Sequence, residues 1–262
     1  MNYRTIALDI DRRGVAAVTL DRPDKHNAMD ADMIGELTGA ATSLGANTGV
    51  RAVVLAAAGK TFCAGGDLNW MKAQAKKDRE GKIEEARALA NMLTAWHSLP
   101  KPVIARVHGP AYGGGVGMIS VSDIAVGVEG AKFGLTETRL GLIPATIGPF
   151  VVRRLGEGFA RQIFFNAKTF DTNFALRSGL LTRVCAPEDL DAAIEEEAAA
   201  FLQCAPGAVA DAKALCRRLG GEDLGSLVDL TVAALADRWE TAEANDGIAA
   251  FFAKRSPPWR MD

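Results

Sequence analysis

Two glycine-containing stretches decide how this chain folds: Phe62-Cys63-Ala64-Gly65-Gly66-Asp67-Leu68, and further on Gly109-Pro110-Ala111-Tyr112-Gly113-Gly114-Gly115. Each follows a short apolar run that is typical of a buried strand, and each precedes a predicted helix. Small residues before a helix leave backbone N–H groups bare at the positive end of the helix dipole. The stretches therefore predict two strand–turn–helix junctions, and two such N–H groups converging on one point would stabilise an oxyanion.

A candidate acid–base residue lies downstream of both turns. Glu137 ends the stretch Phe133-Gly134-Leu135-Thr136-Glu137, at the end of a predicted strand. A carboxylate at that place could exchange protons beside the anion. Gly-rich turns are most often only turns, and a lone glutamate is most often solvated or ion-paired. From composition and spacing alone, the chain is an α/β protein with two candidate anion-binding turns.

The order of the predicted elements indicates an α/β first part and an α-helical last part. Alternating apolar residues over 3–21, with Arg13-Gly14 in the middle, predict a β-hairpin, and Asp30 is the expected cap of a helix over 30–45. A polar stretch over 72–85 leads into a helix that ends near Leu99. Further strands are expected over 51–56, 103–107 and 123–128 and from Phe133, and helices over 148–155, 157–166, 172–178, 188–203, 206–219 and 223–242.

Composition excludes several classes of protein. The chain has 262 residues with 30 Lys+Arg against 32 Asp+Glu, a balance that argues against a general binder of nucleic acid or anionic membranes. With 48% hydrophobic and 24% charged residues it is not a disordered chain. Its 27 glycines and 6% aromatics suit close backbone approaches. Scattered cysteines and the absence of an export pattern predict free thiols and a cytoplasmic protein.

Three apparent motifs depart from the known patterns, either at a single residue or in the spacing of their residues. Residues 56–61 resemble the end of a phosphate-binding loop, but Val54 stands where its leading glycine belongs. Residues 113–118 resemble a dinucleotide-binding fingerprint, but Met118 replaces its third glycine. The histidines lack metal-ligand spacing, and 109–128 is too rich in glycine for a membrane helix. We expect no metal, no separate cofactor and no membrane span.

Spaced motifs carry a family resemblance over nearly the whole chain. Phe62-x-Ala64-Gly65-x-Asp67-Leu68 is followed by His108-Gly109-x-x-x-Gly113-Gly114-Gly115, then by Phe133-x-x-x-Glu137 and Gly141-x-Ile143-Pro144. Residues 20–28, Leu-Asp-Arg-Pro-Asp-Lys-His-Asn-Ala, precede them, and residues 251–255, Phe-Phe-Ala-Lys-Arg, close the series. In this order the motifs resemble the crotonase (enoyl-CoA hydratase/isomerase) superfamily.

The resemblance implies an α/β fold of the crotonase (ClpP-like) type, a spiral of ββα units with a C-terminal α-helical trimerisation region. The spiral core with the active site is expected over 1–200, and the helical region over 201–262. The family binds acyl-CoA thioesters, so CoA is part of the substrate. A homotrimer or a dimer of trimers (a hexamer) is expected, with no nucleic-acid or membrane partner.

The resemblance also assigns site residues. The N–H groups of Gly66 and Gly114 polarise the thioester carbonyl and stabilise the enolate, and Glu137 exchanges a proton at the α-carbon. The remaining candidates for the CoA and acyl sites are Lys25, Ala28, Ala64, Asp67, Leu68, Trp70, Met71, Gly117, Phe251 and Lys254. Of these, Lys25 and Ala28 would lie near the CoA nucleotide, Ala64 would contact adenine, and Phe251 and Lys254 would reach CoA on a neighbouring subunit. Lys25 and Lys254 could equally be solvated charges, and Trp70 and Met71 ordinary helix packing.

One departure from the family pattern bears on the reaction. Typical enoyl-CoA hydratases have a second glutamate two residues after the glycine triplet, and here Gly117 stands there. Enoyl-CoA isomerases also keep only the equivalent of Glu137, which favours an isomerase. Residues 64–72, 113–117 and 139–152, however, resemble a bacterial branch of methylglutaconyl-CoA hydratases in leucine breakdown, which also has glycine at that place.

The sequence thus predicts a lyase of fatty-acid or leucine catabolism that hydrates a 2-enoyl-CoA, with a branched, methylglutaconyl-like substrate favoured. In this prediction Glu137 both orients the water and delivers the α-proton. The first alternative is an enoyl-CoA double-bond isomerase. The second, from another class, is a non-catalytic acyl-CoA-binding or RNA-associated protein of the same fold.

Overall fold

The computed structural model describes residues 3–140 and 142–221, and beyond them residues 241, 242, 246, 250, 253, 255, 256, 258 and 259. A six-stranded sheet in the order β1-β2-β3-β4-β6-β9 forms its centre. The strands are β1 (Ile6–Ile10), β2 (Val15–Leu20), β3 (Ala52–Ala57), β4 (Val103–Val107), β6 (Ile124–Val128) and β9 (Arg183–Cys185). β1 is antiparallel to β2 and the other neighbours are parallel. The loops after β3 and β4 therefore leave from the same edge, where parallel sheets place their sites.

A second, three-stranded sheet links the two regions that the sequence singles out. Its strands β5 (Ala111–Tyr112), β7 (Lys132–Gly134) and β8 (Thr169–Asp171) stand in the order β5-β7-β8. β5 lies inside the second glycine turn, and β7 ends shortly before Glu137. Their parallel pairing, with Tyr112 opposite Gly134, brings the turn and the glutamate into one neighbourhood.

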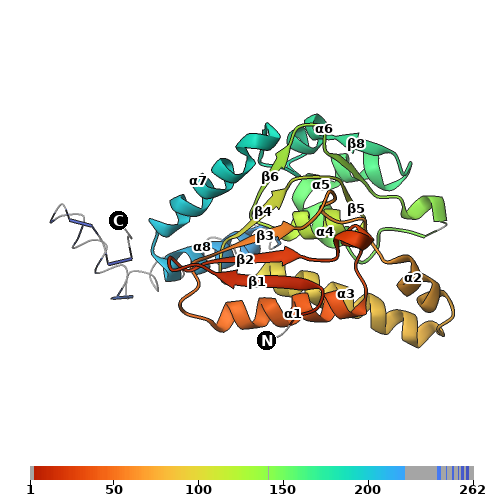
Figure 1. The fold of residues 1–262 in the computed structure, drawn as a ribbon, viewed down its shortest axis with the longest axis horizontal. Helices are drawn as coiled ribbons and strands as arrows, with labels where there is room; N and C mark the ends of the chain where they lie inside the picture. Colours follow the sequence, from red (N-terminus) through yellow and green to blue (C-terminus); the bar gives the residue numbers. More distant parts are fainter. Residues whose placement is uncertain are drawn as a thin grey trace.

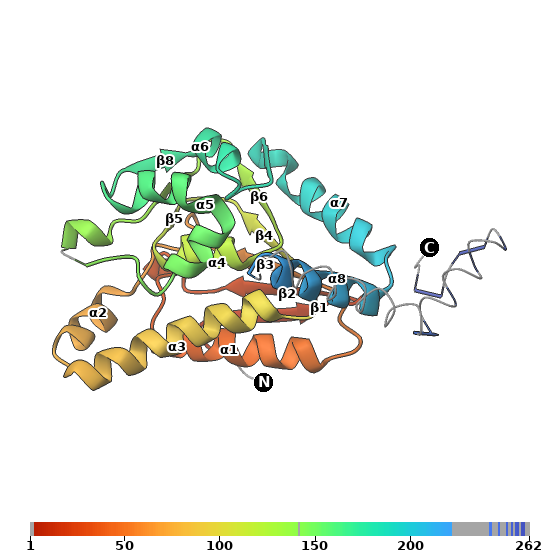
Figure 2. The same ribbon diagram turned by 180° about the vertical axis from the view of Figure 1, so that it is seen from behind.

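Helices cover the central sheet on both sides (Figures 1 and 2). They are α1 (Ala31–Ala46), α2 (Leu68–Ala75), α3 (Arg79–Ser98), α4 (Gly114–Val121), α5 (Gly148–Phe164), α6 (Thr172–Arg177), α7 (Leu190–Leu202) and α8 (Pro206–Leu219). α1 and α3 run side by side, and the indole N–H of the fully buried Trp96 donates to the Leu37 carbonyl (3.1 Å) between them. α7 contacts β3, β4 and β6. In the described part of the chain, no helix combines the length and apolar character that a membrane crossing requires.

Most predicted elements are present, and three differ. The polar stretch over 72–85 contains the end of one helix, α2, and the start of the next, α3, because Asp67 caps α2 and Asp78 caps α3 through hydrogen bonds to backbone N–H groups. The last part is not only helical: β8 and β9 are three residues each, too short for alternation to reveal them. α5 joins two predicted helices across a kink at Gly156, whose φ is +74°. The predicted helix over 223–242, together with Phe251 and Lys254, lies outside the described residues.

Candidate active site

Backbone hydrogen bonds hold the two glycine turns against each other. The N–H groups of Phe62 and Cys63 both donate to the Pro110 carbonyl, at 3.0 and 3.3 Å, and the Tyr112 N–H donates to the Cys63 carbonyl at 2.9 Å. A Cβ on Gly113 would lie 3.7 Å from the Cα of Gly65. Two turns that are far apart in the sequence thus form one unit after β3 and β4.

Each turn has a backbone N–H beside the cavity for which the described residues provide no acceptor. In the first turn the Met29 N–H donates to the Gly65 carbonyl (2.7 Å) and the Asp67 N–H donates to the Met29 carbonyl (2.8 Å), so the Gly66 N–H between them remains unused. In the second turn Gly114 is the first residue of α4, where an N–H has no acceptor within its own helix. Both glycines are half-buried and line the same cavity. The pair has the elements of an oxyanion hole.

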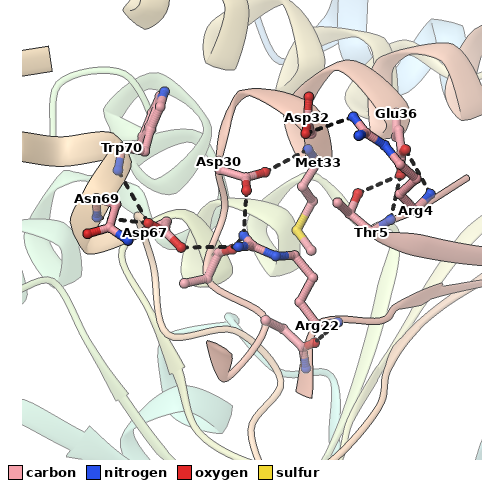
Figure 3. A network of polar contacts seen from close by, with 12 residues as sticks. Arg4, Thr5, Arg22, Asp30, Asp32, Met33, Glu36, Asp67, Asn69 and Trp70 are labelled. Carbon is pink, nitrogen blue, oxygen red and sulfur yellow. Dashed lines mark hydrogen bonds and ion pairs between the residues drawn. The ribbon is translucent and has the colours of Figure 1, made fainter. Parts of the chain in front are cut away.

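Charged side chains fix the first turn (Figure 3). The Asp67 carboxylate accepts from the backbone N–H of Asn69 (2.8 Å) and of Trp70 (3.2 Å) at the start of α2. The Arg22 guanidinium pairs with Asp67 (3.2 Å) and with Asp30 (2.8 Å). Burial opposes ionisation of Asp67, but its backbone hydrogen bonds and Arg22 outweigh burial and lower the pKa of this carboxyl. The Gly66 amide is therefore held on both sides by ionic and hydrogen-bonded contacts.

Glu137 approaches the second turn from the three-stranded sheet. The Gly113 N–H donates to the Gly134 carbonyl (3.0 Å), which fixes the end of β7 beside the turn. The Oε1 atom of Glu137 lies 3.2 Å from the place that a Cβ on Gly113 would take. With φ at +45°, position 113 also has a backbone conformation that favours glycine. Glycine at 113 therefore gives the carboxyl room beside the oxyanion turn.

The Glu137 carboxyl is only partly satisfied by the protein. Its Oε2 atom is buried and has no hydrogen-bond partner among the described residues. Burial raises the pKa of Glu137, and a hydrogen bond from its own backbone N–H opposes this only in part. A half-buried carboxyl with a free oxygen and a raised pKa is suited to taking and giving a proton.

A cavity of about 420 Å³ contains both turns and Glu137. Its other walls come from Met29, from α2 and α3, and from the loop that leads into α5. The lining residues from these walls are Met29, Trp70, Met71, Gln74, Lys82, Ala86, Leu89, Leu142, Ile143, Pro144, Ala145, Thr146 and Ile147. A mostly apolar pocket with few polar groups is typical of a small-molecule site.

Gly117 is buried in α4 and does not line this cavity in the structure. A Cβ at this position would lie 2.8 Å from Cγ2 of Ile147 and 3.5 Å from Cδ2 of Leu93. Apolar side chains thus fill the space in which a second glutamate would have to start. Among the described residues that line the cavity, Glu137 is the only carboxylate.

The other predicted site residues fall into two groups. Lys25, Ala28 and Ala64 are close together, since the Ala64 N–H donates to the His26 carbonyl (3.0 Å) and the Ala28 N–H to the Lys25 carbonyl (3.0 Å). Lys25 and Ala64 are exposed, whereas Ala28 is buried.

The second group lies at the start of α2. Trp70 and Met71 line the cavity, and the Trp70 indole N–H donates to Glu85 of α3 (3.0 Å). Leu68 is 74% exposed, and Asp67 caps the helix.

Sequence reasoning gave no role to Arg22, Met29 or Ile147. The motif over 20–28 was the only sequence signal for Arg22. Its pairing with both Asp30 and Asp67 could not be predicted, because Asp67 is far from Arg22 in the sequence. Met29 joins the first turn through two backbone bonds, which side-chain patterns do not reveal. Over the described residues, no group of His, Cys, Asp and Glu is arranged to hold a metal ion.

The α/β fold thus brings the backbone amides of the two glycine turns and the Glu137 carboxyl to the wall of one mostly apolar cavity. Residues 11–262 match the family described as Enoyl-CoA hydratase/isomerase, and the chain belongs to this family. Its fold is that of the crotonase superfamily, as its solved structural neighbours also show.

Several solved structures and curated proteins resemble the chain along almost its full length. The crystal structure of an enoyl-CoA hydratase from Shewanella pealeana is 39% identical with a TM-score of 0.94, covering 98% of this chain and 96% of that one. AtuE of Pseudomonas aeruginosa is 38% identical with a TM-score of 0.94, covering 98% and 100%. A Thermus thermophilus protein named "Putative enoyl-CoA hydratase" is 33% identical, over 95% of this chain and 99% of its own.

Proposed function

We propose that this protein adds water across the 2,3 double bond of an enoyl-CoA thioester. The observation that carries the proposal is the free, buried Oε2 of Glu137 on the wall of a cavity that Gly66 and Gly114 also line. Relatives named as enoyl-CoA hydratases support this reaction over others of the family.

The two glycine amides supply the stabilisation that the reaction needs. The thioester carbonyl oxygen accepts hydrogen bonds from the N–H groups of Gly66 and Gly114. When water attacks C3, the electrons of the double bond move toward this oxygen and an enolate forms. Because the two donors are already oriented by the folded turns, they stabilise the developing charge without reorganisation.

Glu137 moves the proton. The ionised carboxylate accepts a proton from water as the bond between the water oxygen and C3 forms. The same carboxyl then gives this proton to C2 as the enolate collapses, and Glu137 returns to its ionised state. One carboxyl is enough because the proton that water loses is the proton that the α-carbon gains. The raised pKa of Glu137 makes the protonated intermediate state easier to reach.

The remaining predicted residues have proposed roles around this centre. Lys25, Ala28 and Ala64 bind the nucleotide part of CoA, since they lie together beside the first turn. Phe251 and Lys254 reach the CoA of a neighbouring subunit in a homotrimer or a dimer of trimers.

For the acyl pocket, Trp70 and Met71 form a wall, and Asp67 and Leu68 hold the start of α2. A branched acyl group such as methylglutaconyl is the favoured substrate, because residues 64–72, 113–117 and 139–152 resemble the methylglutaconyl-CoA hydratase branch.

Replacing Glu137 tests the proposal. The Glu137→Gln variant keeps the size and polarity of the side chain but cannot take a proton, so kcat for hydration should fall by roughly 10²–10⁴-fold. Binding of a saturated acyl-CoA, measured by calorimetry, should change little. Hydration that persists near the wild-type rate would contradict the mechanism. Binding of CoA esters by the wild type without any turnover would favour a non-catalytic member of the family.

The pH dependence of the wild type gives an independent check. Hydration needs Glu137 ionised, and burial raises its pKa. We expect kcat/KM to fall toward acid pH with a midpoint above the ordinary glutamate pKa of about 4.3. A rate that is flat down to the ordinary value would contradict the role of Glu137 as the base.

A double-bond isomerase is the second candidate. The observation in its favour is that Glu137 is the only carboxylate among the described residues of the cavity wall, and isomerisation needs one carboxylate to carry a proton between C2 and C4. Incubation with a 2-enoyl-CoA and with a 3-enoyl-CoA in ¹⁸O-labelled water separates the two. Label in the product of the first indicates hydration, and migration of the bond without label indicates isomerisation.

A further inference from the structure

A carboxylate behind the cavity wall joins three parts of the chain. Trp70 lies in the first turn of α2 and lines the cavity, and its indole N–H donates to Oε2 of Glu85 on α3 (3.0 Å). Oε1 of the same carboxylate pairs with the ammonium group of Lys77, which lies between the two helices in the chain. α2 and α3 also contact each other (Figure 2). The Glu85 side chain therefore ties the first turn of α2 to α3 and to the segment that connects them.

The ring of Trp70 is held at two opposite edges. Its Cζ3 atom, on the six-membered ring, lies 3.5 Å from the place that a Cβ on Gly66 would take, and its N–H, on the five-membered ring, points to Glu85. The indole thus extends from the first glycine turn toward α3. The side chain is half-buried, and an indole N–H in such a place needs an acceptor. Rotation of the ring away from Glu85 would break this hydrogen bond, so Glu85 fixes the orientation of this part of the cavity wall.

The hydrogen bond to Trp70 is strengthened by charge, and Glu85 itself does not reach the cavity. The contact with Lys77 lowers the pKa of Glu85 and outweighs burial, which raises it. The acceptor is therefore a carboxylate, and only 17% of the Glu85 side chain is exposed to solvent. Ala86 and Leu89, its neighbours on α3, line the cavity, but Glu85 does not. Glu85 can therefore act on a bound acyl group only through the position of Trp70.

We propose that Glu85 is a positioning residue that limits the length of the acyl group, because it holds the Trp70 ring as a fixed wall of the acyl pocket. This inference rests on the hydratase function proposed above and adds a residue that determines its selectivity. With the ring fixed, a short acyl group packs against the indole, whereas a longer one collides with it. Without Glu85 the ring turns about its side-chain torsions. The pocket then admits the longer chain and packs less well against the short one.

The test compares the CoA esters of 2-butenoic and 2-octenoic acid. The wild type should favour the shorter ester in kcat/KM. Glu85→Leu, which removes both contacts of the carboxylate at similar side-chain size, should lower the ratio of the two kcat/KM values about tenfold, as the loss of one hydrogen bond to a charged group does. The change should come from KM, higher for the short ester and lower for the long one. For the short ester kcat should stay within about threefold, because Gly66, Gly114 and Glu137 are unchanged.

Further variants separate the hydrogen bond from general packing. Glu85→Gln keeps an oxygen that accepts from the indole but loses the ion pair, so it should recover part of the selectivity. Trp70→Phe removes the N–H itself, so Glu85→Leu added to Trp70→Phe should change the ratio no further. Glu84→Leu is the matched control, the same substitution at an exposed neighbour on α3 that does not line the cavity, and it should leave both rates unchanged.

Three results would overturn the proposal. The first is a wild type that hydrates both esters with equal kcat/KM. The second is an equal loss on both esters in Glu85→Leu, which would mean that Glu85 holds the fold and not the shape of the pocket. The third is a full effect of Glu85→Leu in the Trp70→Phe background. Should Glu85→Leu not fold, Glu85→Gln gives the same test, with a shift of about threefold in the wild type and none in Trp70→Phe. An equal shift in both backgrounds would contradict the proposal.

Calorimetry with the saturated esters butanoyl-CoA and octanoyl-CoA tests Glu85 without turnover. Glu85→Leu should weaken the binding of the butanoyl ester and strengthen that of the octanoyl ester. If neither enoyl ester is hydrated but this shift is present, the reaction proposed above fails and the assignment of Glu85 stands. An unchanged ratio of the two affinities would overturn the assignment whatever the reaction is.

Discussion

The two glycine turns present the same chemical group, a backbone N–H beside the cavity, but different forces hold them. Charge fixes the first turn, because Asp67 pairs with Arg22 and caps α2. Close packing fixes the second turn, where Gly113 makes no side-chain cap for α4 and a Cβ on Gly115 would lie 2.9 Å from the Cys63 carbonyl oxygen. In the first turn, by contrast, a Cβ on Gly66 would meet the Met71 side chain at an ordinary 3.4 Å.

This difference predicts that the two turns respond in opposite ways to an added side chain and to the loss of a neighbouring charge. At Gly66 the first turn should tolerate a small side chain, but the turn should not tolerate the loss of its charged partner. The second turn should tolerate changes of nearby charge, but it should not tolerate a methyl group added at Gly115, where the packing is closest. Three substitutions test this contrast, and they are ordered by the size of the expected effect.

Gly115→Ala should have the largest effect. Its methyl group would meet the backbone of Cys63, which cannot move without separating the two turns. We expect a loss of about 1–3 kcal/mol in unfolding free energy, as overpacking costs, measured by chemical denaturation. Activity should fall by about 10²-fold, since one oxyanion donor is displaced.

The matched control for this change is Gly35→Ala. Gly35 is in α1, and a Cβ there would meet no atom within 4 Å. This variant should gain about 0.5–1 kcal/mol from helix propensity and keep full activity. If Gly115→Ala and Gly35→Ala had the same unfolding free energy and the same activity, close packing would not be what holds the second turn.

Arg22→Met should have an intermediate effect. The variant keeps the length of the side chain but leaves Asp30 and Asp67 without their cation, so the Gly66 amide loses part of its support (Figure 3). The bonds between Met29 and the turn remain, and we expect kcat to fall by about tenfold with little change in KM, as a small misplacement of a catalytic group does. Arg22→Lys, which keeps the charge, should recover part of the loss.

A surface ion pair supplies the control for Arg22. Arg4 pairs with Asp32 at 2.9 Å, but the side chains are 74% and 58% exposed. Arg4→Met should change stability by less than about 1 kcal/mol and leave kcat unaffected. If Arg22→Met lowered stability but left kcat unchanged, Arg22 would hold the fold and not the amide.

Gly66→Ala should have the smallest effect. The amide N–H is retained, and the added methyl group meets only the flexible end of Met71 and the ring of Trp70. We expect kcat/KM for hydration within about threefold of the wild type, a change below 1 kcal/mol. A loss as large as that of Gly115→Ala would remove the contrast between the turns.

Much of the fold was predictable from local signals. The hairpin of β1 and β2, the Asp30 cap of α1, and the strands β3, β4 and β6 all follow from alternation, capping residues and short apolar runs. The residues quoted for the family resemblance led to the family that the comparisons show. The strands β8 and β9 were not predicted, because their pairing partners, and not their own residues, make them strands.

By itself, the sequence determined the order of the elements, the two glycine turns and Glu137, since each depends on residues that are neighbours in the chain. Only the tertiary structure decided that the turns meet through Cys63 and Pro110, and that Ile147 fills the space beside Gly117. It also decided that Arg22 and Lys82 belong beside the site, one on the first turn and one on the cavity wall. These facts depend on which distant segments the sheet order brings to one edge, and no local pattern contains that information.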